Sequence, residues 1–396
     1  MNLTDVDDKT IKGSNGKKKE FLELGKKYAK AFFEDAKELN IEPPRKYTRA
    51  TKHIKEMVEL IRKLIEKDYA YKTEDGIFYN VSKFKDYGKL AHLNLKGLKA
   101  GARVKVDQYE KEQANDFALW KAYDKEDNEI YWDAAFWIDG EKVIVKGRPG
   151  WHIECSAMSM KYLGESFDIH TGGIDLIFPH HENEIAQSEA ATGKKFVKYW
   201  VHNEHLLVDG KKMAKSLSNF YTLRDLLKKG YKADAIRFLL LGTHYKQQLN
   251  FTLDGVKAAE NSVSNLRDFI DRVKEGKDSK ESEELVKKVK KDFEKALDDD
   301  LNISEALAAI FEFVHKINKI GGGKKVYEVM LEFDKVLGLN LGKEERIPAE
   351  IKKLVDEREK ARKEKDFEKA DRIREDIKKK GYILEDSDSE VRVKKI

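Results

Sequence analysis

The spacing of apolar side chains predicts helices in the first part of the chain. Within residues 18–71, apolar positions recur at intervals of three and four, which is typical of helices that bury one face. The clearest series is Ile54, Met57, Val58, Ile61 and Leu64. A Pro-Pro pair at 43–44 interrupts the pattern. We therefore expect separate helices on its two sides.

Residues 116–208 have a mixed pattern. Short β-prone runs alternate here with helical stretches, and they lie at 142–145, 167–170 and 201–208. Alternation of this kind is typical of proteins in which helices pack on a sheet. The sequence therefore predicts the α/β class for this part.

Beyond about residue 256 the pattern becomes helical and rich in charge, with breaks at 274–282 and at the glycine run 321–323. One apolar stripe predicts a helix packed in a bundle; it consists of Ile303, Leu307, Ile310, Val314 and Ile317. A last helix is expected over 349–380, ending at Gly381 as its C-cap, before a short β-prone tail. We expect three domains, with bounds 1–255, 256–342 and 343–396.

Composition narrows the class of protein. The chain has 396 residues, of which 38% are charged and only 5 are prolines, as expected for several domains with long helices exposed to water. No apolar run is long enough for a bilayer, and no secretory signal is recognisable at the start. The single cysteine, Cys155, excludes an intramolecular disulfide and fits a reducing compartment. We expect a cytoplasmic protein without a membrane partner.

Aromatic and imidazole side chains are concentrated in one region. All five tryptophans lie between Trp120 and Trp200, and six of the ten histidines lie between His152 and His205. The net charge of +5 permits a nucleic-acid partner but does not by itself indicate one. Chemistry is therefore expected within this histidine-rich region.

Three residues of this region form a candidate metal site: Cys155, His180 and Glu184. Pro179 is suited to the first position of a helix, and the i, i+4 spacing then places imidazole and carboxylate on one face. A thiolate, an imidazole and a carboxylate suit Zn²⁺, and three protein ligands leave a fourth position open. The alternative is a buried apolar cysteine beside a surface His-Glu pair. The spacing differs from that of zinc proteases, so hydrolysis is not indicated.

A short basic segment forms a candidate phosphate site. A turn at 209–210 follows the β-prone run, and the segment 211–216 (KKMAKS) comes directly after it. Lysines on such a loop can neutralise the charge that develops as pyrophosphate leaves. The alternative is a loop that is simply solvated.

Together these segments resemble those of cysteinyl-tRNA synthetases, a family of class I aminoacyl-tRNA synthetases. The matching segments are 4–8 (TDVDD), 101–104 (GARV), 150–158 (GWHIECSAM), 178–184 (FPHHENE), 212–216 (KMAKS), 298–302 (DDDLN) and the helix around 361–377. Ala214 replaces the first serine of the family's Lys-Met-Ser-Lys-Ser signature. The resemblance covers essentially the whole chain.

The resemblance implies a partial, N-terminally truncated Rossmann-type class I catalytic domain with a helical insertion, a helical anticodon-binding bundle and a small C-terminal segment. It also implies activation of L-cysteine by ATP with Mg²⁺, and transfer to tRNA(Cys). One Zn²⁺ per chain would be bound by Cys155, His180 and Glu184. The amino-acid pocket would be lined by Thr4, Trp151 and Asp175. Lys212 and Lys215 would stabilise the transition state, and Lys215 would also bind ATP.

Two other functions remain open at this stage. Ligases that join cysteine to an amino sugar resemble the same core, but they lack a helical region like that beyond residue 256. A non-catalytic tRNA-binding remnant is the second alternative. Family members also begin with a segment that carries another zinc-binding cysteine and a His-Ile-Gly-His signature, which precedes the 4–8 segment. We expect activity to need this segment, supplied by an earlier start or by a separate N-terminal polypeptide.

Overall fold

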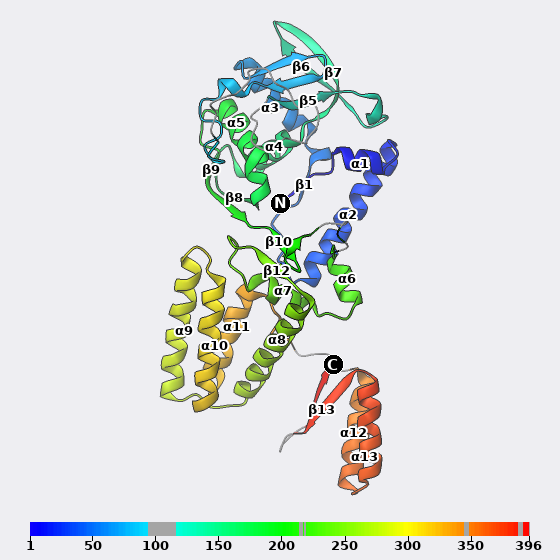
Figure 1. Cartoon of the computed structure of the whole chain (residues 1–396), viewed down its shortest axis with the longest axis vertical. Helices are drawn as coiled ribbons and strands as arrows, with labels where there is room; N and C mark the ends of the chain where they lie inside the picture. The colour runs from blue at the N-terminus through cyan, green and yellow to red at the C-terminus, as the bar shows by residue number, and fades with distance from the viewer. Residues whose placement is uncertain (94–115, 214–216, 218, 344–347, 387–390, 396) are drawn as a thin grey trace. The chain divides into compact units, whose positions relative to one another are not determined.

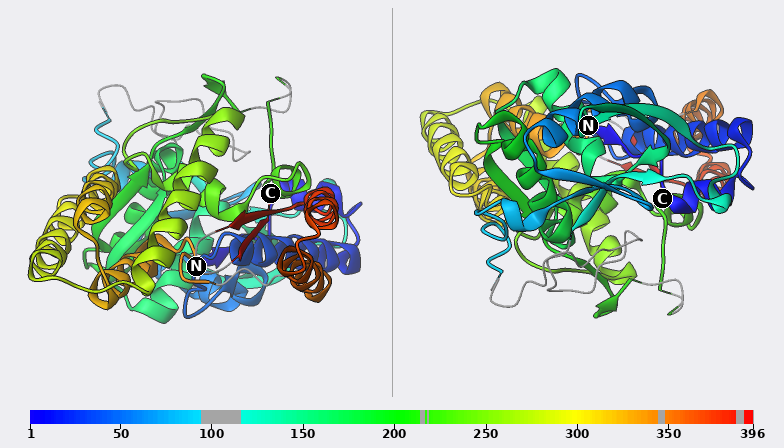
Figure 2. Two further views of the ribbon diagram at one scale, coloured as in Figure 1. Left: turned by 90° about the horizontal axis from the view of Figure 1, so that it is seen from below. Right: turned by 90° about the horizontal axis from the view of Figure 1, so that it is seen from above.

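The computed structural model describes residues 1–93, 116–213, 217, 219–343, 348–386 and 391–395. The chain divides into two compact units, Met1–Leu339 and Asn340–Ile396. Figure 1 and Figure 2 show the elements of each unit, and the units are described separately below. In the described part of the chain, no helix is both long enough and apolar enough to cross a membrane.

The first unit contains most of the helices and strands. Its described helices are α1 (Asp8–Gly13), α2 (Lys18–Glu38), α3 (Ile54–Glu66), α4 (Trp151–Leu163), α5 (Glu182–Thr192), α6 (Leu223–Lys228), α7 (Ala233–Leu241), α8 (Leu253–Lys274), α9 (Lys280–Asp298), α10 (Ile303–Ile320) and α11 (Lys324–Leu337). Its described strands are β1 (Asn2–Leu3), β2 (Thr48–Arg49), β3 (Ala70–Thr73), β4 (Gly76–Tyr79), β5 (Phe117–Ala122), β6 (Trp132–Ile138), β7 (Glu141–Pro149), β8 (Phe167–Gly173), β9 (Val197–Asn203), β10 (Leu206–Val208), β11 (Lys211–Lys212) and β12 (Leu249–Phe251).

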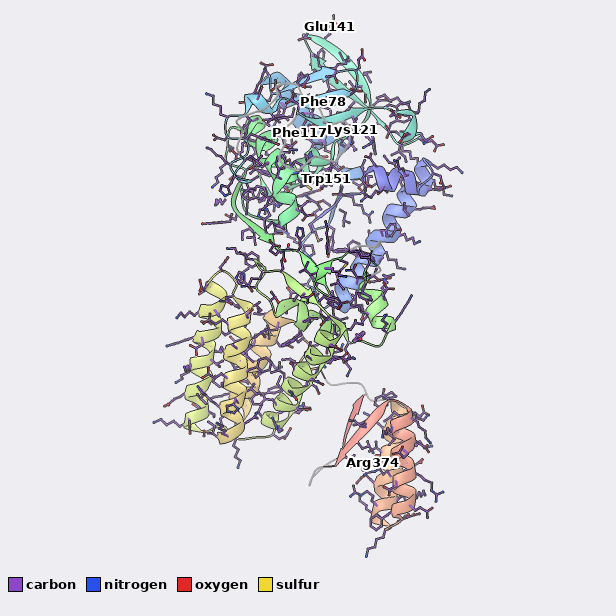
Figure 3. All side chains as sticks on the ribbon, in the orientation of Figure 1. Phe78, Phe117, Lys121, Glu141, Trp151 and Arg374 are labelled. Carbon is purple, nitrogen blue, oxygen red and sulfur yellow. The ribbon has the colours of Figure 1, made fainter. Side chains whose placement is uncertain are left out.

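Parallel strand pairs combine with helices, which confirms the predicted α/β class. Strands β1 and β2, β8 and β9, and β10 and β12 are paired in parallel. The predicted β-prone runs are found in β7, in β8, and across β9 and β10. The pattern did not predict the five-stranded sheet of order β3-β4-β5-β7-β6, whose neighbouring strands are all antiparallel. Its hairpin β6–β7 carries Glu141, labelled in Figure 3.

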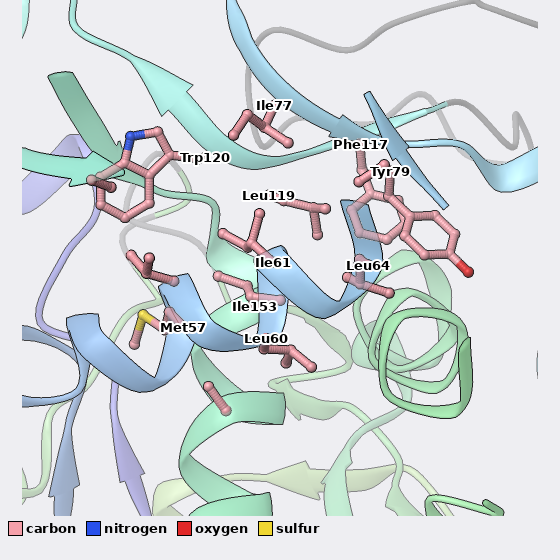
Figure 4. Close-up of a cluster of buried hydrophobic side chains, with 14 of the residues drawn as sticks. Met57, Leu60, Ile61, Leu64, Ile77, Tyr79, Phe117, Leu119, Trp120 and Ile153 are labelled. Atoms are coloured by element: carbon pink, nitrogen blue, oxygen red, sulfur yellow. The ribbon is translucent and has the colours of Figure 1, made fainter. Parts of the chain in front are cut away.

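An apolar core joins this sheet to helix α3. The helix buries the predicted stripe, with Met57, Ile61 and Leu64 fully covered, because residues three and four apart share one face. Figure 4 shows these side chains beneath residues of β4 and β5. In the same core the rings of Tyr79 and Phe117 stack with centroids 4.9 Å apart. Since α3 also contacts α4 and α5, the core fixes the two helices that carry the candidate metal ligands.

The helical part of the first unit follows β12. The predicted stripe lies on α10, where Leu307, Ile310 and Ile317 are buried, which confirms the packed helix. The turn before α10 is tied to the segment after α7, because the Tyr245 hydroxyl donates to Asp300 Oδ1 at 2.6 Å. The segment 298–302 thus contacts the residues that follow α7.

The second unit is a pair of helices with a hairpin. Its elements are α12 (Ala349–Lys363), α13 (Phe367–Lys379), β13 (Tyr382–Asp386) and β14 (Val391–Lys395). The structure divides the single helix predicted over 349–380 into two. Lys365 has φ 60°, which ends α12, and the Asp366 side chain accepts from Lys369 N at 3.1 Å, which starts α13. Gly381 follows α13 with φ +83°, as expected near a helix end.

Removal of Phe117 tests the shared core. We expect Phe117→Ala to lower the free energy of unfolding by about 3–5 kcal/mol, because it leaves a cavity under the sheet. Trp137→Ala is the matched control, since Trp137 is 56% exposed and its loss should change the value by less than about 0.5 kcal/mol. Urea unfolding followed by far-ultraviolet circular dichroism measures both. Equal effects of the two substitutions would contradict the assigned core.

Candidate functional site

Helix α4 presents three chemically distinct side chains on one face. Trp151 and Cys155 are four residues apart, and His152 and Cys155 are three apart, so all three lie along the same side of the helix. Gly150, which precedes the helix, donates its N–H to the carbonyl of Leu119 in β5 at 2.9 Å. The start of α4 is therefore fixed by the antiparallel sheet. Trp151, labelled in Figure 3, is half-buried and His152 is buried.

The turn before α5 supplies the other two candidate ligands. Pro179 lies within a helical turn at Ile177–His181 that leads into α5. His180 Nε2 and Glu184 Oε1 are 3.0 Å apart, as the i, i+4 spacing predicts. One donor atom from each of Cys155, His180 and Glu184 lies within 4.8 Å of the others. The structure therefore brings the three predicted metal-ligating residues together.

Strands β8 and β9 add further imidazoles around Glu184. His170 Nε2 lies 3.0 Å from Glu184 Oε2, and His181 Nδ1 lies 2.7 Å from His202 Nε2. The rings of His170 and Trp200, paired across the two strands, stack with centroids 4.8 Å apart. His170, His181 and Glu184 thus form a second group whose donor atoms lie within 4.8 Å of one another.

Burial and charge act in opposite directions on the ionisable groups of the site. Burial opposes ionisation of Glu184, yet attraction to His180 and the hydrogen bond with His170 hold its pKa well below the usual range. Burial raises the pKa of the Cys155 thiol, and the Glu184 carboxylate raises it further. Burial lowers the pKa of His181 to about 3. Without a cation, the site therefore favours a carboxylate, a protonated thiol and a neutral His181.

The donor set fits a zinc ion. Glu184 is fully buried, and its Oε1 accepts no well-formed hydrogen bond from the described residues, although His180 Nε2 is near. Such an atom is costly to leave unsatisfied, and a cation would satisfy it. Two ligands of a tetrahedral zinc lie about 3.4–3.8 Å apart, so small side-chain shifts suffice from the observed spacing. A bound cation would also favour the thiolate of Cys155 over the thiol.

The predicted amino-acid pocket residues have different environments. The Trp151 ring stacks on His180, with centroids 4.2 Å apart and planes 23° apart. Thr4 follows β1 and is half-buried, and the nearby side chain of Asn2 in that strand lowers the pKa of the Cys155 thiol, against the larger effect of burial. Asp175 is exposed, and a β-carbon added to Gly173 would lie 2.4 Å from its Oδ1. Glycine at 173 therefore permits this close approach of the carboxylate.

The signature segment begins on a small sheet. Lys212 is exposed on β11, where it pairs with Leu207 of β10, and Met213 packs against the apolar cluster that contains Val208. Asn219 Nδ2 donates to the carbonyl of Lys212 at 3.1 Å. The base of the loop is thus fixed on both sides. Lys215 and the matching segment 101–104 lie outside the described residues.

Sequence reasoning did not assign His152, His170, His181, Trp200 or His202 to the site. The sequence feature that pointed to them was the concentration of histidine and tryptophan in one region. This feature does not indicate which side chains contact one another. His170 and His202 lie on neighbouring strands, and only the pairing of β8 with β9 brings them near α5.

Comparisons with known proteins identify the family. A model of the class I (C) tRNA synthetase catalytic domain matches residues 1–261, a DALR domain model matches 292–342, and a model of the cysteinyl-tRNA ligase anticodon binding domain matches 344–393. A cysteine–tRNA ligase of Protochlamydia amoebophila is 50% identical over all of this chain and 84% of its own length. One of Chlamydia felis is 45% identical, over all of this chain and 85% of its own length.

A solved structure agrees in fold. The methionyl-tRNA synthetase of Mycobacterium tuberculosis, bound by methionyl-adenylate, superposes with a TM-score of 0.53 at 15% identity, over 76% of this chain and 70% of its own. That identity supports the fold alone. With the domain models and the relatives that match the full chain, it places the protein among the class I synthetases. The chain belongs to the cysteine–tRNA ligase family.

Proposed function

We propose that this protein activates L-cysteine with ATP in the presence of Mg²⁺ and transfers the cysteinyl group to tRNA(Cys). The observation that carries the proposal is the convergence of Cys155, His180 and Glu184 beside Trp151. Family membership supports a role in tRNA charging, and this cluster supports cysteine as the amino acid. We also propose a cytoplasmic location. The additional N-terminal segment or polypeptide stays a prediction.

The choice of cysteine over serine is the chemical problem that the site must solve. The two amino acids are nearly equal in size, so packing alone discriminates poorly between them. Zinc bound by Cys155, His180 and Glu184 would supply a soft Lewis acid that favours a thiolate over a hydroxyl. Trp151 stacks on His180 and forms an apolar wall at these ligands. Thr4 and Asp175 complete the proposed pocket.

The signature lysines are proposed to act on ATP. Lys212 and Lys215 would stabilise the charge that develops as the carboxylate of cysteine attacks the α-phosphate, and Lys215 would also contact ATP. The anchored base of the loop supports this role, because Met213 and Asn219 restrict where Lys212 can reach. The replacement of a serine by Ala214 leaves both lysines in place.

The acceptor is proposed to be tRNA and not an amino sugar. Matches to the DALR and anticodon binding domain models cover 292–342 and 344–393. Amino-sugar ligases do not need domains that bind the anticodon. A non-catalytic tRNA-binding remnant would not need the buried group of donor residues Cys155, His180 and Glu184. Both alternatives are therefore less well supported than tRNA charging.

The metal site is tested by elemental analysis. We expect about one zinc per chain, and we expect the double substitution Cys155→Ala, His180→Ala to remove it, because only one of the three proposed ligands, Glu184, is then left. His205→Ala is the matched control, since His205 is exposed and lies outside the donor groups. Unchanged zinc in the double variant would exclude these residues as ligands.

The signature loop is tested by cysteine-dependent exchange of pyrophosphate into ATP, measured with the expected N-terminal segment supplied. Lys212→Ala should lower the rate about 100- to 1000-fold, because one preorganised charge is lost from the transition state. Lys211→Ala is the control, since neighbouring residues of β11 point to opposite faces and both lysines are exposed. If the two substitutions lower the rate equally, no specific role belongs to Lys212.

The second unit is tested by removal of residues 340–396, which form a compact unit of their own. We expect affinity for tRNA(Cys) to fall and to depend less steeply on salt, because contacts to phosphate are lost. With the expected N-terminal segment supplied, cysteine-dependent pyrophosphate exchange should be the same with and without residues 340–396, since that reaction needs no tRNA. Filter binding at several salt concentrations measures the first effect. Full affinity in the shortened chain would rule out tRNA binding by this unit.

A further inference from the structure

Two histidines outside the proposed ligand set contact the ligands themselves. His152 Nδ1 lies 2.9 Å from His180 Nδ1, and His170 Nε2 lies 3.0 Å from Glu184 Oε2. Each ring also packs against an aromatic side chain. The rings of Phe117 and His152 meet edge to face with centroids 5.5 Å apart, and the Trp200 ring stacks on His170. These contacts have the form of outer partners that orient metal ligands.

The contact between His152 and His180 determines which nitrogen of each ring carries the proton. Two imidazole nitrogens 2.9 Å apart need one donor and one acceptor. His180 Nε2 faces Glu184 Oε1, so it is the nitrogen available to a metal and must be unprotonated. With Nε2 unprotonated, His180 carries its hydrogen on Nδ1, and this N–H donates a hydrogen bond to His152 Nδ1. His152 is consequently the acceptor.

The contact between His170 and Glu184 separates the two carboxylate oxygens. The N–H at His170 Nε2 donates to Oε2, whereas Oε1 points toward His180 Nε2. One oxygen is thereby occupied and the other remains for the metal. Since the ring plane of His170 is fixed by Trp200 on the neighbouring strand, the orientation of Glu184 depends on the register of β8 against β9.

We infer that His152 and His170 are positioning residues of the zinc site, His152 by fixing the tautomer of His180 and His170 by selecting Oε1 of Glu184. This inference rests on the proposed function. It differs from a second metal site formed by His170, His181 and Glu184, in which His170 would bind the metal instead of serving only to orient Glu184 by a hydrogen bond. The two assignments predict different metal contents.

Zinc affinity of the full chain, measured by competition with a chromophoric chelator, tests His152. Asparagine places a polar atom near the position of Nδ1, glutamine places it near Nε2, and leucine has none. We expect His152→Gln and His152→Leu to weaken zinc binding about 10- to 100-fold and His152→Asn to weaken it much less. Because His152 is buried, the comparison of Asn with Gln decides the result if the leucine variant does not fold.

The role of His170 is tested by comparing the zinc affinity of two variants, His170→Gln and His170→Leu. Glutamine keeps a donor near the position of Nε2, so His170→Gln should bind zinc almost as tightly as the unmodified chain, and His170→Leu about 10- to 100-fold more weakly. Cobalt bound in place of zinc gives a second readout, since its visible absorption bands should shift in the leucine variant as the Glu184 oxygen reorients. A merely structural role would leave these bands unchanged.

The outcomes separate this inference from the proposed function. Equal zinc affinity and equal cobalt spectra for the paired variants would overturn the positioning roles while the zinc site stands. Two zinc ions per unmodified chain, reduced to one in His170→Leu, would overturn the role of His170 in favour of a second metal site. An unmodified chain that binds no zinc would overturn the metal site and the positioning roles together.

Discussion

The candidate site depends on one fully buried carboxylate, that of Glu184. A buried charge is tolerated only when partners surround it, and here they come from several elements. His180 approaches from the turn before α5, His170 from β8 and Cys155 from α4. The packing of α4 on α5 and the pairing of β8 with β9 must therefore both form before the Glu184 carboxylate has its partners. The same requirement concentrates the imidazoles of the chain around one point.

The antiparallel sheet and α3 act as the support of this arrangement. Their core fixes α4 and α5 against each other. A set of buried side-chain hydrogen bonds then sets how the two helices align along their length. Gln187 donates to the His152 carbonyl and to Ser156 Oγ, each at 2.7 Å, and Ser188 donates to the same hydroxyl at 2.9 Å. These buried bonds prevent α5 from sliding along α4, because any shift would leave them unmade.

The proposed sites for the amino acid and for ATP lie in two different parts of the first unit. The donor cluster lies between buried helices, whereas Lys212 is exposed on the short strand β11. A rigid site suits discrimination between side chains of similar size. The exposed Lys211 and Lys212 of β11 suit the contact with ATP that is proposed for this segment. The hydrogen bond of Tyr245 with Asp300 joins the catalytic domain to the turn before α10 of the helical bundle.

The sequence by itself determined much of the architecture and of the donor set. Apolar spacing predicted α3 and α10, because helix periodicity is a local property. The i, i+4 spacing predicted the contact of His180 with Glu184 for the same reason. The single cysteine left one thiol available as a ligand.

Only the tertiary structure decided what depends on distant strands and loops. Of the antiparallel sheet, only part of β7 was predicted; β4 and β5 are buried along nearly their whole length, so they show no alternation of polar and apolar positions. The division of the last predicted helix at Lys365 depends on a left-handed residue that the charged pattern does not reveal. The pairings of His152 with His180 and of His170 with Glu184 join residues 28 and 14 positions apart. No local periodicity specifies such contacts, since they arise from the packing of α4 on α5 and the register of β8.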